Sequence, residues 1–462
     1  MKITQGPRTG CAGIASGRTL LGLAAWTLAA ASTAQWKSDL DACARASLSA
    51  EQRAEVCTKA LQSEGLSPQD QAVTYNNRGV AWKSKGDVDR AIADYDRAVA
   101  LDPRFANAYN NRGAALGSKG DLDSAIANFD QAIRLDPKLA QAYDNRGVAL
   151  LSKGDLDGAL KDLGEAIRLD PQTDRNYLDR AGAWEAKGEL DKAVADLSEA
   201  IRINPTHEDL FVARGLIWDR QRNTTRAIAD YDEAIRLNPQ FAEAYNNRCN
   251  TWLTKEAYDQ AIADCSEAIR IDPHLAPARF NRGVAWSIAN EYAKAKAEFD
   301  EAIRLNPQFA PAYKSRAALY FYQGQFESAQ SDLAQAAQLR RADPYVALWR
   351  FLAQARAGQA EAAARELARS APEGARGAWP APVFDLYLGR SDPASVFKAA
   401  QQGDADVQRD QQCEAAFYVG QWHLLRAEKG SAVRLFEDAQ RNCRKSFSES
   451  GGARAELDRM AK

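Results

Sequence analysis

Asparagine recurs along this chain of 462 residues at the same place in a series of segments that are each 34 residues long. A primary amide both donates and accepts hydrogen bonds, so a row of amides suits the backbone of an extended peptide. Asparagine also disfavours helix interiors relative to alanine, so its recurrence calls for a reason. The recurring set consists of Asn77, Asn111, Asn145, Asn247 and Asn281, and it is interrupted at Asp179, Ala213 and Ser315.

Further amides lie beside this set in the sequence, and they are Asn76, Asn110, Asn246 and Asn250. These nine asparagines are the candidate residues of a peptide-binding groove. The interruptions place the best candidate surfaces in segments one to three and in segments six and seven. The sequence leaves an alternative open, in which the asparagine is an inherited repeat residue that points into solvent.

The 34-residue unit has the pattern of two helices. Eight copies begin at Ala72, Ala106, Ala140, Asp174, Glu208, Ala242, Ala276 and Ala310, and they cover residues 72–343 without a gap. We number positions from 1 at the start of each copy. In the second half, Ala91, Tyr95 and Ala98 at positions 20, 24 and 27 share one helical face. A proline at position 32 closes seven copies and ends the second helix.

In period, helix–turn–helix form and small and aromatic positions, the chain resembles the tetratricopeptide-repeat family. The resemblance implies an all-α fold, an α-solenoid of stacked antiparallel helix pairs, with a concave groove lined by the first helix of each pair. Stacking lets pairs share a core that one pair cannot form alone. The asparagines are similar to the ladder with which some superhelical members hold peptides. The clamp that other members use for terminal carboxylates is matched only at Asn250 and Asn281, so its function is not carried over.

An arginine at position 7 follows the asparagine position in all eight copies: Arg78, Arg112, Arg146, Arg180, Arg214, Arg248, Arg282 and Arg316. A basic row of this kind suits acidic ligands. Position 23 is acidic in seven copies, however, and positions 7 and 23 come close to the same level of an antiparallel hairpin. We therefore expect an arginine–carboxylate pair between the two helices of a repeat, and exposed pairs contribute about 0.2–1 kcal/mol each.

Six cysteines fall into three pairs at matching levels of predicted hairpins. In an antiparallel hairpin, residues opposite one another have position numbers with a constant sum. The repeat positions of Cys249 and Cys265 sum to 32. The positions of Cys413 and Cys443 also sum to 32 when a further repeat is counted from residue 413. Cys43 and Cys57 lie on either side of a short turn. We predict disulfides Cys43–Cys57, Cys249–Cys265 and Cys413–Cys443; the alternative is buried free thiols, above all at Cys249 and Cys265.

Residues 1–34 have the order of segments of a secretory signal peptide. Lys2, Arg8 and Arg18 precede an apolar centre, and small residues end at Ala34. Cleavage after Ala34 would remove Cys11 and leave an even number of cysteines in a periplasmic or secreted protein. The alternative is an uncleaved membrane anchor, although the stretch is short for a spanning helix.

The remaining segments flank the repeats. Residues 35–71 are expected to form an N-terminal helical hairpin cap. Residues 344–462 are expected to form degenerate C-terminal repeat-like helices with a break at residues 371–382 and a polar capping helix at the end.

Catalysis is not indicated. His207, His274 and His423 are far apart, and the sequence has no phosphate-binding loop, dinucleotide fingerprint, zinc-ligand spacing or nucleophile elbow. We therefore expect no catalytic residue, no metal and no cofactor.

Composition narrows the function further. A hydrophobic content of 45% excludes wholesale disorder, and a net charge of -2 excludes a strongly basic nucleic-acid binder. The sequence favours a scaffold or adaptor that binds a protein or peptide. The alternative is a self-associating structural solenoid that supports an envelope assembly.

Overall fold

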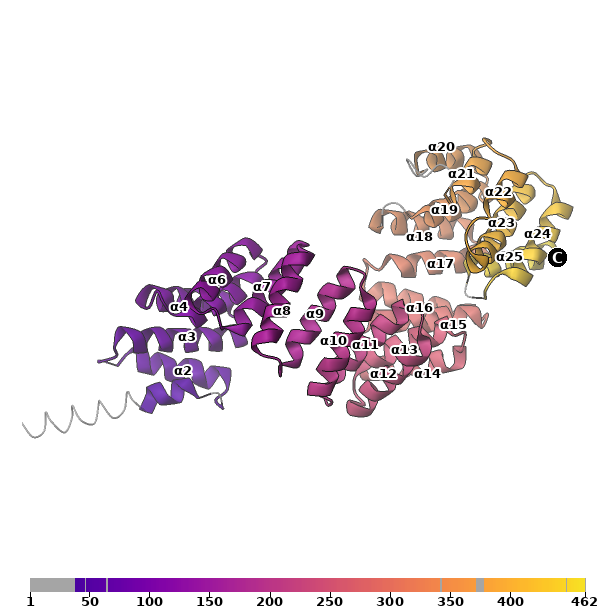
Figure 1. Cartoon of the computed structure of the whole chain (residues 1–462). Coiled ribbons are helices and arrows are strands. Elements are labelled where there is room, and N and C mark those ends of the chain that lie inside the picture. The colour runs from indigo at the N-terminus through magenta and orange to yellow at the C-terminus, as the bar shows by residue number, and fades with distance from the viewer. Residues whose placement is uncertain are drawn as a thin grey trace, which may run out of the picture. The chain divides into compact units, whose positions relative to one another are not determined.

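The computed structural model describes residues 38–45, 47–63, 65–340, 343–370, 378–445 and 447–461. Every regular element in these residues is an α-helix, and consecutive helices pair (Figure 1). The all-α solenoid prediction is therefore confirmed. Within the described residues, every helix is too short or too polar to span a lipid bilayer. The predicted signal peptide lies outside the described residues.

The chain forms two compact units that divide between residues 205 and 206. In the first unit, residues 38–44 are helical and pair with the next helix across the predicted short turn. The labelled helices of this unit are α2 (Ala50–Leu61), α3 (Pro68–Ser84), α4 (Val88–Leu101), α5 (Ala106–Ser118), α6 (Leu122–Leu135), α7 (Ala140–Lys153), α8 (Leu156–Leu169), α9 (Asp174–Ala186) and α10 (Leu190–Ile203).

The second unit begins with four further repeats. Its helices are α11 (Glu208–Arg220), α12 (Thr224–Leu237), α13 (Ala242–Thr254), α14 (Tyr258–Ile271), α15 (Ala276–Ile288), α16 (Tyr292–Leu305), α17 (Ala310–Tyr322), α18 (Phe326–Leu339), α19 (Pro344–Arg356), α20 (Ala360–Ser370), α21 (Ala381–Tyr387), α22 (Pro393–Ala399), α23 (Ala405–Leu425), α24 (Lys429–Asn442) and α25 (Ser448–Met460).

Two helix boundaries and the burial of the last helix differ from the sequence expectation. Helix α3 begins at Pro68, four residues before the first copy, because Ser67 caps its N-terminus and Pro68 suits the first helical position. Helix α21 begins inside the segment expected to be a break. Helix α25 is more than a polar cap, since Glu449, Gly452 and Glu456 are buried.

The turn inside each repeat needs one residue in the left-handed conformation at position 15. Glycine provides it at Gly86, Gly120 and Gly154, where φ is 81°, 85° and 85°. The aspartate that follows caps the second helix, as Asp121 does by accepting a hydrogen bond from the backbone N–H of Ser124 at 3.2 Å. The Gly-Asp pairs are therefore helix turns.

Two helices of a repeat meet most closely between positions 8 and 24. A Cβ added to Gly79, Gly113 or Gly147 would lie 2.7 Å from the side chain at position 24 of the same repeat. That side chain is an aromatic ring or a leucine and is buried. The absence of a side chain at position 8 therefore sets the spacing of the hairpin.

We expect Gly113→Ala to lower the free energy of unfolding by about 1–3 kcal/mol, because its new methyl group overlaps the ring of Phe129. Gly117→Ala on the same helix is the control. A Cβ at Gly117 meets only the Cβ of Ala125 at 3.7 Å, so this variant should gain about 0.5–1 kcal/mol from helix propensity. Urea unfolding of the two variants should shift in opposite directions, and equal shifts would contradict the packing argument.

The structure joins all three predicted cysteine pairs by disulfides, with Cα–Cα distances of 4.9, 5.5 and 5.0 Å. In the sixth repeat, Cys249 occupies position 8 and Cys265 occupies position 24. The covalent bond therefore replaces the contact between glycine and a large side chain that holds the two helices of one repeat together.

Reduction of Cys249–Cys265 should destabilise the sixth repeat by about 3 kcal/mol, because the bond closes a loop of 16 residues. The double variant Cys249→Ala, Cys265→Ala should show this loss in thermal unfolding. The double variant Cys249→Gly, Cys265→Phe restores the pair found in the second repeat and should recover part of it. Mass spectrometry of the non-reduced protein checks all three pairs, and free thiols would refute the pairing.

Candidate peptide-binding surface

The arginine at position 7 joins the two helices of its own repeat. In the first repeat, Arg78 Nε and Nη2 lie 2.8 and 2.7 Å from the two carboxylate oxygens of Asp94. All eight repeats have this contact, with Asn128 as the partner of Arg112 at 2.8 Å. The predicted arginine–carboxylate pairs are therefore confirmed in seven repeats, and six of these pairs have the two-point geometry of a strong pair.

The same arginine also reaches the preceding repeat. Arg112 Nη1 lies 2.7 Å from Asp96, and Arg146 Nη1 lies 2.6 Å from Asp130. In the seven repeats that have an aromatic ring at position 4, the guanidinium also lies over that ring, as Arg112 lies 5.3 Å from the centre of Tyr109. The hydrogen bond to Asp162 raises the pKa of Arg146, so this side chain stays charged. These arginines are bonded to carboxylates of their own or the preceding repeat, so they do not form a free basic row for ligands.

The asparagines form a second link between repeats. Asn111 Nδ2 donates to Asn76 Oδ1 at 2.9 Å, Asn145 Nδ2 donates to Asn110 Oδ1 at 2.9 Å, and Asn281 Nδ2 donates to Asn246 Oδ1 at 3.0 Å. In each case position 6 of one repeat donates to position 5 of the repeat before it. This bond explains why asparagine recurs despite its low helix propensity.

Positions 5 and 6 differ in how far their side chains are buried. Position 5 is buried in the first unit, where Asn76 and Asn110 are only 7% and 1% exposed, so it holds the next repeat. Most position-6 residues are half-buried, although Asn281 is buried as well, and Asn250 at position 9 is exposed. An amide that uses one N–H keeps the second N–H and the lone pairs of its oxygen for other partners.

We call the position-6 residues Asn77, Asn111 and Asn145 in the first unit, and Asn247 and Asn281 in the second, the asparagine face. Each group lies on successive first helices of its own unit, linked through the bonds described above.

The row is broken by two acids where the third repeat meets the fourth. Asp144 occupies position 5, and Asp179 occupies the position 6 from which an asparagine donates elsewhere. Asp179 accepts a hydrogen bond from Arg175 Nε at 2.6 Å, whereas the buried Asp144 Oδ1 has no donor among the described residues. Burial, and then the charge of Asp179, raise the pKa of Asp144 to about 7. Burial also raises the pKa of Asp179, against the effect of Arg175.

Stability should fall as the pH rises through about 7, because a group with a raised folded-state pKa stabilises the fold only while it keeps its proton. Asp144→Asn restores the amide of the neighbouring repeats and should flatten this dependence. It should also raise the free energy of unfolding near neutral to mildly basic pH by about 1–3 kcal/mol. Asp259→Asn, at an exposed place on α14, is the control. Parallel pH profiles for wild type and Asp144→Asn would contradict the assignment.

Three further buried acids, Glu414, Glu449 and Glu456, lie among the C-terminal helices, and the sequence analysis did not single them out. Glu414 accepts hydrogen bonds from Tyr345 Oη at 3.0 Å and Trp379 Nε1 at 2.6 Å. Burial, followed by the charge of Glu449, raises the pKa of Glu414 to about 7. Its position inside an apolar run is a signal that sequence reading could have used.

Glu449 connects α25 to the same cluster. It accepts hydrogen bonds from Trp349 Nε1 at 3.1 Å and Tyr418 Oη at 2.8 Å. These bonds account for Glu414 and Glu449 as packing elements. Among the described residues, no group of three or more histidine, cysteine, aspartate or glutamate side chains is arranged to hold a metal ion.

Sequence models of the tetratricopeptide repeat match residues 79–120, 116–154, 145–208 and 242–275. The last match has the bounds of the sixth copy, Ala242 to Leu275. The chain is a tetratricopeptide-repeat protein. No curated protein sequence matches it.

Solved structures with related folds share low sequence identity with this tetratricopeptide-repeat protein. A tetratricopeptide repeat protein from Parabacteroides merdae is 21% identical, with 54% of this chain and 98% of that chain covered and a TM-score of 0.46. PilF of Pseudomonas aeruginosa is 17% identical, with 46% and 96% covered and a TM-score of 0.41. YrrB, a TPR protein with an unusual peptide-binding site, is 26% identical, with 41% and 96% covered and a TM-score of 0.33.

Proposed function

We propose that this protein is a scaffold or adaptor that binds a protein or peptide along the asparagine face and has no catalytic activity of its own. The observation that carries the proposal is the row of amides at position 6. They recur on successive first helices, and Asn111, Asn145 and Asn281 keep hydrogen-bonding capacity beyond their bonds to the preceding repeat. An extended peptide presents N–H and C=O groups that such amides can pair with.

We further propose that the protein works in the periplasm or outside the cell. The signal-peptide pattern of residues 1–34 supports export. The three disulfides support an oxidising compartment, because disulfides persist there and are rare in the cytosol.

Selection of phage-displayed peptides on the purified protein tests the binding function. The triple variant Asn77→Ala, Asn111→Ala, Asn145→Ala should weaken binding of peptides that occupy the first unit at least about tenfold, because three amide partners are lost. Fluorescence anisotropy of labelled peptides measures the change.

A matched variant separates binding from folding. Asn76→Ala with Asn110→Ala removes the buried acceptors at position 5 and leaves all three position-6 amides in place. It should lose stability in thermal unfolding and keep most of its peptide affinity. If both variants lose affinity in proportion to stability, the asparagines are structural only.

Self-association is the competing function, and sedimentation velocity distinguishes it. Oligomers that grow with concentration, together with no recoverable peptide, would contradict the adaptor proposal and favour a structural solenoid.

A further inference from the structure

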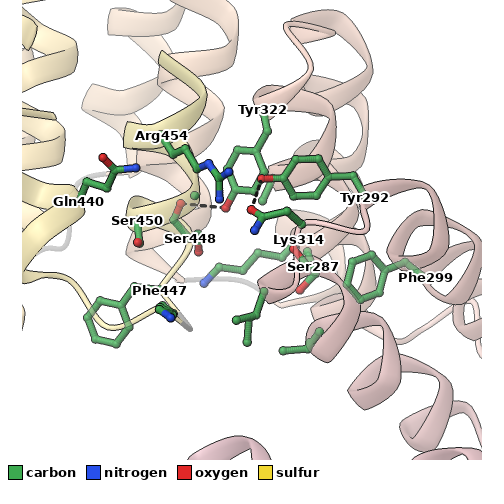
Figure 2. Close-up of a pocket in the computed structure, with 17 residues that line it drawn as sticks. Ser287, Tyr292, Phe299, Lys314, Tyr322, Gln440, Phe447, Ser448, Ser450 and Arg454 are labelled. Atoms are coloured by element: carbon green, nitrogen blue, oxygen red, sulfur yellow. Dashed lines mark hydrogen bonds between the residues drawn. The ribbon is translucent and has the colours of Figure 1, made fainter. Parts of the chain in front are cut away.

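A cavity of about 310 Å³ opens in the second unit where α25 packs against the first helices of the seventh and eighth repeats (Figure 2). The repeats contribute Ser287 from α15 together with Lys314 and Ser315 from α17. The opposite wall includes residues from the start of α25 and just before it, namely Lys445, Phe447, Ser448, Ser450, Gly451 and Arg454. We call this cavity the C-terminal pocket.

The C-terminal pocket continues the asparagine face of the second unit. Lys314 and Ser315 occupy positions 5 and 6 of the eighth repeat, which are the positions of Asn246 and Asn247 in the sixth. The seventh repeat, which carries Asn281, lies between them. A peptide that lies along these first helices would therefore reach the pocket at the end of the repeat array.

The wall formed by α25 is held firmly in place. Tyr322 Oη donates to the backbone oxygen of Ser448 at 2.8 Å (Figure 2). A Cβ on Gly451 would lie 2.8 Å from Tyr322, so glycine permits this close approach. Further along the helix, Arg459 pairs with the buried Glu456 at 2.7 Å and donates to the backbone oxygen of Phe321 at 3.0 Å. The pocket is therefore preformed.

The lining carries positive charge. Lys314, Lys445 and Arg454 all contribute, and the described lining residues include no aspartate or glutamate. Lys314 pairs with Asp343 at 3.2 Å, outside the lining. Lys445 and Arg454 are exposed, and no described carboxylate forms an ion pair with either. Their charges are available to an anion, in contrast to the arginines at position 7.

The other lining groups suit a carboxylate on a short aliphatic stem. Hydroxyl groups of Ser287, Ser448 and Ser450 can donate hydrogen bonds to carboxylate oxygens. The rings of Tyr292 and Phe447 offer apolar surface for methylene groups. A volume of about 310 Å³ is large enough for an acidic side chain together with ordered water.

We propose that the C-terminal pocket binds the carboxylate of an acidic side chain in a peptide that lies along the asparagine face. This proposal rests on the peptide-binding function proposed above and specifies an acidic residue in the ligand. Two of its three cations come from outside the repeats, so the site differs from the clamp for terminal carboxylates.

Phage-displayed peptides of 12 residues, selected on the whole protein purified without reductant, test this proposal. Peptides selected on wild type should be enriched in aspartate and glutamate, and the double variant Lys445→Gln, Arg454→Gln should abolish the enrichment. The control, Lys429→Gln with Arg441→Gln, removes the same charge from exposed places on α24 outside the pocket. A selected peptide should bind about tenfold more weakly after glutamate is replaced by glutamine, and likewise to the double variant.

The outcomes separate the two proposals. Recovery of no peptides would reject the peptide-binding function. Recovery of peptides without acidic enrichment, or with enrichment that the double variant retains, would overturn the pocket assignment and leave the binding function standing. Calorimetric titration with free glutarate is the final arm, because binding as tight as that of the peptide would show that the pocket takes a small anion instead.

Discussion

The close approach of two helices at positions 8 and 24 is the constraint on which the rest of each repeat depends. A large side chain on the second helix fits only because the first helix has no bulk opposite it. In the fourth and eighth repeats, position 8 is alanine and position 24 is leucine. In the sixth repeat, the two positions are the cysteines of a disulfide. The total volume across the hairpin is restricted in every version, as close packing requires.

Two polar rows continue this arrangement from one repeat to the next. The arginine at position 7 lies beside the close contact and ties its own hairpin to the preceding one through carboxylates. The asparagine at position 6 ties first helices together through amides. Because the arginines are bonded to carboxylates inside the stack and the position-6 amides keep further donors and acceptors, the neutral row is the better candidate for binding a peptide.

The C-terminal helices cover the apolar face at the end of the repeat array. A solenoid ends with an apolar face that has no neighbour, and here aromatic side chains cover it, including the stacked pair Trp349 and Phe417 with ring centres 5.3 Å apart. Glu449, which accepts from Trp349, and Glu456, which contacts Gln421 and Arg356, then attach α25 to this core. The same attachment places Lys445 and Arg454 in one pocket with residues of α15 and α17, at the end of the array.

The sequence by itself determined everything that depends on separations within one hairpin. The three cysteine pairs and the pairing of Arg78 with Asp94 follow from a nearly constant sum of positions across two antiparallel helices. Only the tertiary structure decided which polar groups remain available, because that depends on stacking between repeats. Asn110 and Asp144 are both buried, but Asn110 accepts a hydrogen bond from the next repeat, whereas Asp144 Oδ1 has no donor among the described residues. The tertiary structure also places Ser448 beside Tyr322, which is 126 residues earlier in the chain. A repeating pattern specifies local register, whereas burial and contacts between distant segments arise only when the helices pack.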